Sequence, residues 1–317
     1  MKNYRPTTPD IWQGRKSENK LYLHEIVEVE HLKQIAKTEA KAVALLGYCC
    51  DKGVRRNLGR IGAKEAPDAI RNMLGGLANH WEQIGLVDFG NFRAEESLLE
   101  DVQEQTAAAV KQILKHGYFP VVMGGGHDLA YAHFRGIRNA FPHQKIGIIN
   151  LDAHFDLRDG SEQGNSGTPF WQIAQEEQQS FVYCCLGIQK AANNTDLFKT
   201  AEALQIKYLL NTEFTIQNWL QIKSVLDDVL EASDSIYLSI DLDGFASAYA
   251  PGVSAPSPMG FQPDVALKVI NYLVQSQKLV STDLVELNPK YDLDHATARL
   301  ASRLIYELAD SLDSLNT

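Results

Sequence analysis

The chain has 317 residues, of which 44% are hydrophobic and 22% charged, a composition typical of a globular protein that can bury a large core. Its 30 Lys and Arg against 40 Asp and Glu give a formal net charge of −10, and no segment combines clustered basic residues with aromatic ones. This balance argues against nucleic acid and anionic membrane surfaces as partners.

The first 20 residues are polar, so we expect no secretory signal, and no apolar run approaches the roughly 20 residues of a membrane span. The four cysteines form two adjacent pairs, Cys49-Cys50 and Cys184-Cys185, inside apolar runs. Neighbouring strand residues point to opposite faces, which disfavours a disulfide within a pair, and the spacing fits no zinc motif. We therefore expect reduced cysteines in a cytoplasmic protein.

Eight apolar runs predict β-strands. Each holds about five to eight residues rich in Val, Ile and Leu, as expected for strands that helices cover on both faces. In chain order the runs are residues 42–48, 84–89, 119–123, 145–151, 181–186, 206–210, 235–240 and 279–285.

Amphipathic segments with helix start signals alternate with these runs. The clearest are residues 67–71, 95–115, 261–264 and 294–312. The alternation predicts an α/β protein: a single three-layer α/β/α domain over residues 1–317, with a mostly parallel sheet of about eight strands. Residues 1–40 would pack on it as an N-terminal extension.

Polar residues follow four of the runs, at the points where the predicted strands end. The segments are residues 124–128, 152–156, 241–243 and 286–288. Because the carboxyl ends of parallel strands meet at one edge of a sheet, where ligands bind in such folds, we expect these segments to form a site.

The spacing within these segments favours a metal site. In extended backbone, residues two apart share a face, so Asp152, His154 and Asp156 can converge, as can Asp241 and Asp243. Carboxylates this close would raise one another's pKa unless a cation lies between them. Any one of these acids alone could be a turn or helix-cap residue, but together they predict metal binding.

His127 brings the candidate ligands to six, most of them carboxylates. This set is too large for one tetrahedral zinc ion and suits two bridged divalent ions. The oxygen-rich surroundings favour manganese, although nickel, cobalt or zinc could also bind.

Three motifs resemble those of the arginase (ureohydrolase) superfamily: Gly124-Gly125-Gly126-His127, Asp152-Ala153-His154-Phe155-Asp156 and Ser239-Ile240-Asp241-Leu242-Asp243. The resemblance implies an arginase-like fold and two Mn²⁺ per chain. Glu286 matches the carboxylate that binds the cationic end of the substrate, with a structural capping role as the alternative. The implied ligands are His127, Asp152, Asp156 and Asp241 for one metal, and Asp152, His154, Asp241 and Asp243 for the other, with Asp152 and Asp241 bridging.

Within this superfamily the chain resembles the formimidoylglutamases, which hydrolyse N-formimidoyl-L-glutamate to L-glutamate and formamide in histidine degradation. Residues 10–15, 53–63 and 166–170 carry this resemblance. Ser166 stands where agmatinases have a histidine. The chain departs from the superfamily at Ala246-Ser247, where an Asp-Pro pair is usual, so a carboxylate beside the metal ligands is missing.

The implied substrate has two carboxylates beside its amidine, so local cations are needed to receive it. The candidates are Arg55, Arg56, Arg60 and Arg158. We expect either Arg55 or Arg56 to reach the substrate. The residues Asn165, Ser166 and Thr168 are also expected to bind the substrate.

In the implied mechanism a hydroxide between two manganese ions attacks the formimidoyl carbon, Glu286 binds the amidinium, and Asp156 relays a proton to the leaving amine. The alternatives are an agmatinase- or arginase-type guanidino hydrolase, a binuclear phosphoesterase and a non-catalytic metal-binding relative. We expect a homo-oligomer that acts on a small molecule and binds neither nucleic acid nor membrane.

Overall fold

The computed structural model describes residues 2–315, in which ten strands form one sheet. The strand order is β1-β4-β3-β5-β10-β9-β6-β7-β8, and β2 also pairs with β4. Within the described chain, β1 with β4 is the one antiparallel pair. The strands are β1 (Tyr4–Arg5), β2 (Glu28–Val29), β3 (Ala42–Cys49), β4 (Gly85–Arg93), β5 (Phe119–Met123), β6 (Ile146–Leu151), β7 (Val182–Ile188), β8 (Lys207–Leu210), β9 (Ser235–Asp241) and β10 (Leu279–Val285).

The predicted fold class is confirmed, and β3 to β10 coincide with the eight predicted runs. The two further strands, β1 and β2, have two residues each and lie along β4, so the N-terminal segment extends the sheet at its edge. The assignment of the whole chain to a single domain stays a prediction.

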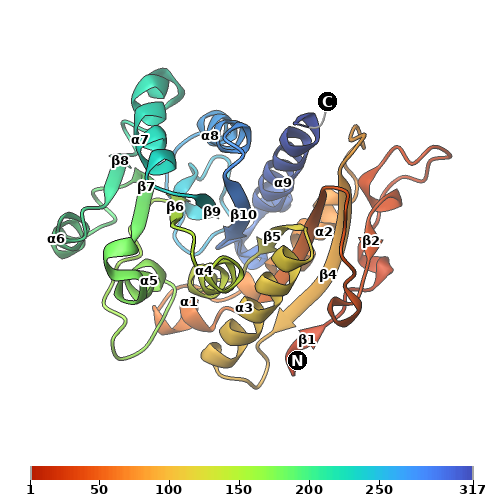
Figure 1. Cartoon of the computed structure of the whole chain (residues 1–317), viewed down its shortest axis with the longest axis horizontal. Coiled ribbons are helices and arrows are strands. Elements are labelled where there is room, and N and C mark those ends of the chain that lie inside the picture. Colours follow the sequence, from red (N-terminus) through yellow and green to blue (C-terminus); the bar gives the residue numbers. More distant parts are fainter. Residues whose placement is uncertain (1, 316–317) are drawn as a thin grey trace.

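Helices cover both faces of the sheet and give three layers (Figure 1). One face carries α3 (Leu99–Lys115), α4 (Leu129–Ala140), α5 (Pro169–Glu177) and α6 (Thr195–Ala203). The other carries α2 (Ala66–Leu74), α7 (Trp219–Glu231), α8 (Pro263–Gln275) and α9 (Ala296–Ser314). A short helix, α1 (Lys52–Arg56), follows β3. The four predicted helix segments correspond to α2, α3, α8 and α9.

A buried ion pair joins α2 to β4. The Arg71 guanidinium donates from Nε and Nη2 to the two carboxylate oxygens of Asp88, at 2.8 and 2.7 Å, and both side chains are fully buried. Trp12 donates its indole N–H to the same carboxylate at 2.9 Å. Asp88 therefore connects the N-terminal segment, α2 and β4.

All four cysteines are buried and outside any disulfide, as expected. Burial raises the pKa of Cys49, Cys50 and Cys184 to about 12, which keeps these thiols protonated. Between residues 2 and 315, every helix is too short or too polar to cross a membrane.

Candidate metal centre and active site

The strand order brings the four polar segments together. β5, β10, β9 and β6 are adjacent and parallel, so the residues that follow or end them meet at one edge of the sheet. His127 follows β5, Glu286 follows β10, Asp241 ends β9, and Asp152 follows β6. Segments that are far apart in the chain thus build one site, as the parallel sheet predicts.

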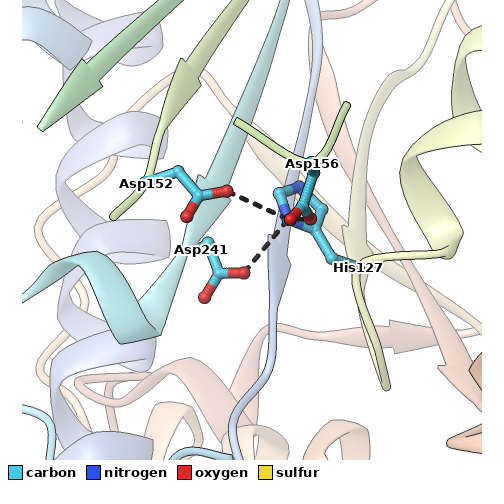
Figure 2. A group of neighbouring side chains, drawn as sticks. All are labelled: His127, Asp152, Asp156 and Asp241. Atoms are coloured by element: carbon cyan, nitrogen blue, oxygen red, sulfur yellow. Dashed lines mark ion pairs between the residues drawn. The ribbon is translucent and has the colours of Figure 1, made fainter. Parts of the chain in front are cut away.

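His127 lies at the centre of a group of three carboxylates (Figure 2). Its Nδ1 atom is 3.2 Å from Asp152 Oδ2, 2.9 Å from Asp156 Oδ2 and 3.0 Å from Asp241 Oδ2. Apart from Asp156, which is partly exposed, these side chains are almost completely buried. Four atoms that can bind a metal therefore surround one point.

A second group lies beside the first and shares Asp152. His154 Nδ1 is 3.5 Å from Asp152 Oδ1 and 3.3 Å from Asp243 Oδ2. The two oxygens of Asp152 face different histidines, so its bridging role also stays a prediction that this arrangement allows. Asp241 directs Oδ2 to the first group, while its Oδ1 accepts from the backbone N–H of Asp243 at 2.7 Å. A bridging role for Asp241 stays a prediction.

The backbone reaches this convergence by a different route from the expected extended one. β6 ends at Leu151, and the Asp152 side chain accepts from the backbone N–H of His154 at 2.6 Å, which turns the chain. Asp156 then has a left-handed backbone, with φ of 49°. Residues 242–244 form a 3-10 helix capped by Asp241. The expected grouping is present, but short turns produce it because the side-chain carboxylates bind their own backbone.

The loop after β5 depends on glycine. A Cβ on Gly125 would lie 1.8 Å from the carbonyl oxygen of Cys50, so the backbone of this loop passes too close to β3 for any side chain. This close approach carries His127 over the ends of β10 and β9.

The charges of the cluster fit divalent cations. Burial, and then the charges of Asp243 and Asp152, raise the pKa of Asp241 well above its usual range. Burial opposes a charge on His127, but hydrogen bonding to Asp152 and the other nearby carboxylates raises its pKa well above the ordinary value. Both shifts mean that the cluster attracts positive charge.

Two buried atoms of the candidate ligands lack a hydrogen-bond partner among the described residues. His127 Nδ1 and Asp243 Oδ1 are buried, and neither forms a hydrogen bond of good geometry within residues 2–315. Buried polar atoms are normally satisfied. Two divalent ions would satisfy both atoms and offset the carboxylates, so the residues fit a binuclear site.

Glu286 faces the same site from the end of β10. It is 5% exposed, and its Oε1 accepts from the backbone N–H of His127 at 2.8 Å. Burial, and then the charge of Asp243, raise its pKa to about 8. A cation placed against this carboxylate would therefore be stabilised strongly.

A cavity of about 270 Å³ opens over the cluster and contains some of the predicted substrate residues. Arg60, Arg158 and Ser166 line it together with His154 and Glu286. Its volume suits a small molecule.

The two lining arginines differ in their contacts. Arg60 donates from Nε to the Ser254 carbonyl at 2.9 Å and from Nη2 to the Val253 carbonyl at 2.5 Å, so its guanidinium holds a neighbouring loop. Arg158 is exposed, and its guanidinium forms no hydrogen bond or ion pair with any described residue. Arg158 is therefore the lining arginine free to receive an anion.

Arg55 and Arg56 do not line this cavity, contrary to the expectation that one of them reaches the substrate. Both line a separate cavity beside the ends of β3 and β4. Arg56 pairs with Glu100 at 2.6 Å and donates to the Gly164 carbonyl at 2.9 Å. The segment that contains both arginines is the helix α1, and consecutive helical residues diverge by about 100°. It is therefore not the bent loop over the cluster that the sequence suggested.

The loop that contains Asn165, Ser166 and Thr168 is held mainly by its own side chains. Asn165 Oδ1 accepts from the Gly167 backbone N–H at 2.8 Å, and Thr168 Oγ1 accepts from the Asn165 backbone N–H at 2.9 Å. Ser166 points to the cavity and accepts from Asn57 Nδ2 at 3.1 Å. Of the three, Ser166 is the one that lines the cavity.

The sequence analysis missed several polar residues near the site. Asn57 and Asn193 line the cavity. Asn193 has no motif in the sequence, because it binds the 153–155 segment only after folding. His133 and Asp283, which lie 2.7 Å apart below the cluster, were also missed. The polar triplet Ser281-Thr282-Asp283 inside a buried strand is the signal that could have indicated them.

Comparisons with known proteins agree with this geometry. The sequence profile of the arginase family matches residues 41–310. A formimidoylglutamase from Legionella pneumophila (strain Lens) is 41% identical over 318 residues, covering 98% of each chain. One from Clostridium tetani is 37% identical over 329 residues, covering 98% of this chain and 96% of the relative.

Solved structures give the same result. The crystal structure of formimidoylglutamase from Bacillus subtilis covers 95% of this chain and 94% of its own, with a TM-score of 0.85 and 21% identity, which shows a shared fold. Trypanosoma cruzi formiminoglutamase with Mn²⁺ has a TM-score of 0.78 and 26% identity, covering 90% of this chain and 99% of its own. Since the family profile spans most of the sequence and the Legionella relative is similar over nearly its whole length, the chain belongs to the arginase family.

Proposed function

We propose that this chain hydrolyses N-formimidoyl-L-glutamate to L-glutamate and formamide in histidine degradation, with two manganese ions as its cofactor. The curated relatives named above carry that activity in their names, and the Trypanosoma cruzi structure contains Mn²⁺. The observation that carries the proposal is a single cavity lined by four of the six candidate metal ligands, by Glu286 and by the unpaired Arg158.

The metal ligands fit the cofactor, and a pair of divalent ions supplies a water of lowered pKa as the nucleophile. Glu286 supplies the complementary charge for the substrate. An amidinium is a planar cation with N–H donors, and a buried carboxylate beside the cluster can accept these hydrogen bonds. While Glu286 stays ionised, it stabilises the protonated amidinium, and the formimidoyl carbon therefore keeps the positive charge that favours attack.

Asp156 is placed to move a proton. Its Oδ2 atom is 2.9 Å from His127 Nδ1, and its side chain is partly exposed to the cavity. A carboxyl at the wall of the cavity can take up a proton and return it. The glutamate nitrogen must leave as a neutral amine, so a proton delivered from Asp156 completes the cleavage.

Arg158 and Ser166 favour this substrate over a guanidine. Arginine and agmatine present a cation without a side-chain carboxylate, whereas formimidoylglutamate presents two carboxylates that an arginine can bind. A phosphoesterase is disfavoured because Glu286 would repel a phosphate.

The test is an assay of manganese-loaded protein for formamide from N-formimidoyl-L-glutamate, beside urea from arginine and from agmatine and phenolate from p-nitrophenyl phosphate. We expect formamide release alone. Urea release at a higher kcat/KM would assign a guanidino hydrolase, and metal binding without any turnover would assign a non-catalytic relative.

A further inference from the structure

A chain of polar residues runs through the apolar interior directly below the cluster. β9 contributes Tyr237 and Ser239, and β10 contributes Ser281 and Asp283. The parallel register pairs Asp283 with Ser239 and Ser281 with Tyr237, so the four lie side by side. His133 of α4 covers them. All five side chains are fully buried, so no bulk water can replace their hydrogen bonds; we name them the buried network.

The hydrogen bonds of this network determine where His127 carries its proton. Ser239 donates its hydroxyl to Asp283 Oδ1 at 2.7 Å. A serine has one hydroxyl proton, so its oxygen can then only accept from His127 Nε2, which is 2.9 Å away. When Nδ1 binds a metal, the one remaining ring proton of His127 therefore lies on Nε2, and the Nδ1 lone pair faces the space between the carboxylates of the cluster.

Asp283 is held in turn by two further donors. Its Oδ2 accepts from His133 Nδ1 at 2.7 Å and from the Tyr237 hydroxyl. Burial, and then the charge of Asp283, raise the pKa of Tyr237 well above its ordinary value, so this phenol stays a donor. Three donors on one carboxylate leave Asp283 no freedom to rotate away from Ser239.

We infer that Asp283 acts through Ser239 as a positioning residue, which fixes the tautomer and the ring orientation of His127 for metal binding. His133 and Tyr237 hold Asp283 in place. In many metal sites a carboxylate contacts the ligand histidine directly. Here a serine relays the contact, and neither Asp283 nor Ser239 lines the substrate cavity. The inference rests on the metal-dependent function proposed for the same site, and it requires no particular substrate.

The test is a titration of metal-free, full-length protein with Mn²⁺, measured by calorimetry and by electron paramagnetic resonance, which distinguishes a coupled pair of ions from isolated ions. Ser239→Ala should lower the affinity for one of the two ions by about 10–100-fold, the usual effect of removing a partner of a ligand histidine. The signal of the coupled pair should be lost at Mn²⁺ concentrations that saturate the wild type. Ser239→Thr keeps the hydroxyl and should restore the affinity.

The matched control is Ser281→Ala. It also removes a fully buried serine hydroxyl from a buried histidine, since Ser281 Oγ lies 2.6 Å from His133 Nε2, but it leaves the contacts between Asp283, Ser239 and His127 intact. We expect its Mn²⁺ affinities to stay within about threefold of the wild type, well inside the effect of losing a ligand partner. Asp283→Asn provides a second variant of similar shape if Ser239→Ala does not fold.

Wild-type affinity for both ions in Ser239→Ala, or an equal loss in Ser281→Ala, would overturn the inference while leaving the proposed reaction untouched. Conversely, normal binding of two Mn²⁺ by the wild type without formamide release would overturn the proposed reaction and leave the positioning role standing. Failure of the wild type to bind Mn²⁺ would overturn both.

Discussion

Glu286 and Asp156 share an uncommon backbone conformation. Both have positive φ values, 65° for Glu286 and 49° for Asp156, in the backbone region that residues other than glycine rarely adopt. Such residues cost roughly 1–3 kcal/mol each and persist where the surroundings determine them. For Glu286 these surroundings are two hydrogen bonds, from its own N–H to the Gly125 carbonyl at 2.9 Å and from the His127 N–H to its carboxylate at 2.8 Å. Its carboxylate is therefore fixed before a substrate arrives.

Glu286→Gln should reduce kcat/KM for N-formimidoyl-L-glutamate by a factor that corresponds to about 2–4 kcal/mol, because a neutral amide cannot offset the amidinium. Steady-state kinetics measures this loss, and elemental analysis should show unchanged manganese. Glu100→Gln, at a partly exposed ion pair with Arg56 outside the cavity, is the control and should behave as the wild type. An unaltered kcat/KM in Glu286→Gln would place the amidinium elsewhere.

Arg158→Ala should lower kcat/KM for N-formimidoyl-L-glutamate by a factor that corresponds to about 1.5–3 kcal/mol, the usual contribution of a hydrogen bond to a charged group. The loss should disappear for one of two analogues, each of which lacks one of the substrate carboxylates. Arg55→Ala removes an exposed arginine that lines the separate cavity, and it should have little effect. Equal losses on all three substrates would show that Arg158 has a structural role and does not bind a carboxylate.

At the scale of elements, strands covered on both faces could be predicted because their apolar runs are continuous. β1 and β2 could not, because each has two residues and forms only through pairing with β4. The grouping of polar strand ends also followed from parallel topology. The turn at residues 152–156 did not, since it depends on a side-chain carboxylate that binds its own backbone.

The positions of the arginines were harder to predict for a related reason. Arg55 and Arg56 belong to the short helix α1, which points their side chains in directions that differ from those expected for a loop. Arg60 binds carbonyls of a segment almost 200 residues away in the chain. Neither fact has a local signal in the sequence. Arg158 follows a ligand segment directly, so its place near the cavity could be predicted.

The ion pair between α2 and β4 gives a prediction on stability. Arg71→Leu leaves the Asp88 carboxylate buried with no cation beside it, so we expect the free energy of unfolding to fall by about 3–5 kcal/mol. Urea unfolding measures the change. Arg56→Ala removes a partly exposed pair with Glu100 and should change the free energy of unfolding by less than about 1 kcal/mol. A similar small change in Arg71→Leu would mean that water reaches Asp88.

For the whole molecule, the cluster makes the stability of the metal-free protein depend on pH. The pKa of Glu286 rises from 4.5 to about 8 on folding, and the pKa values of Asp241, His127 and His154 also rise. The folded state therefore binds more protons than the unfolded state between these limits, and raising the pH favours unfolding.

The free energy of unfolding of the metal-free protein should accordingly fall as the pH rises from about 5 to 8, by up to about 1.4 kcal/mol per pH unit for each group, and the thermal midpoint should fall with it. Mn²⁺ should restore stability most at the upper end of this range, because its ligands bind it when deprotonated. Thermal unfolding with chelator and with Mn²⁺ measures both effects. Glu286→Gln should show a shallower fall, and a midpoint that rises with pH in the chelated wild type would contradict the prediction.

The central place of β10 determines when this site can come into existence during synthesis. All six candidate ligands lie between residues 127 and 243, yet β10, which spans Leu279–Val285, separates β5 from β9 in the sheet. A nascent chain that ends before residue 279 has His127 on one side of an empty strand position and Asp241 on the other. The other five ligands follow or end β6 and β9, which pair directly, so it is His127 that waits for β10. The complete set of six ligands therefore assembles only after the ribosome has released the chain through β10.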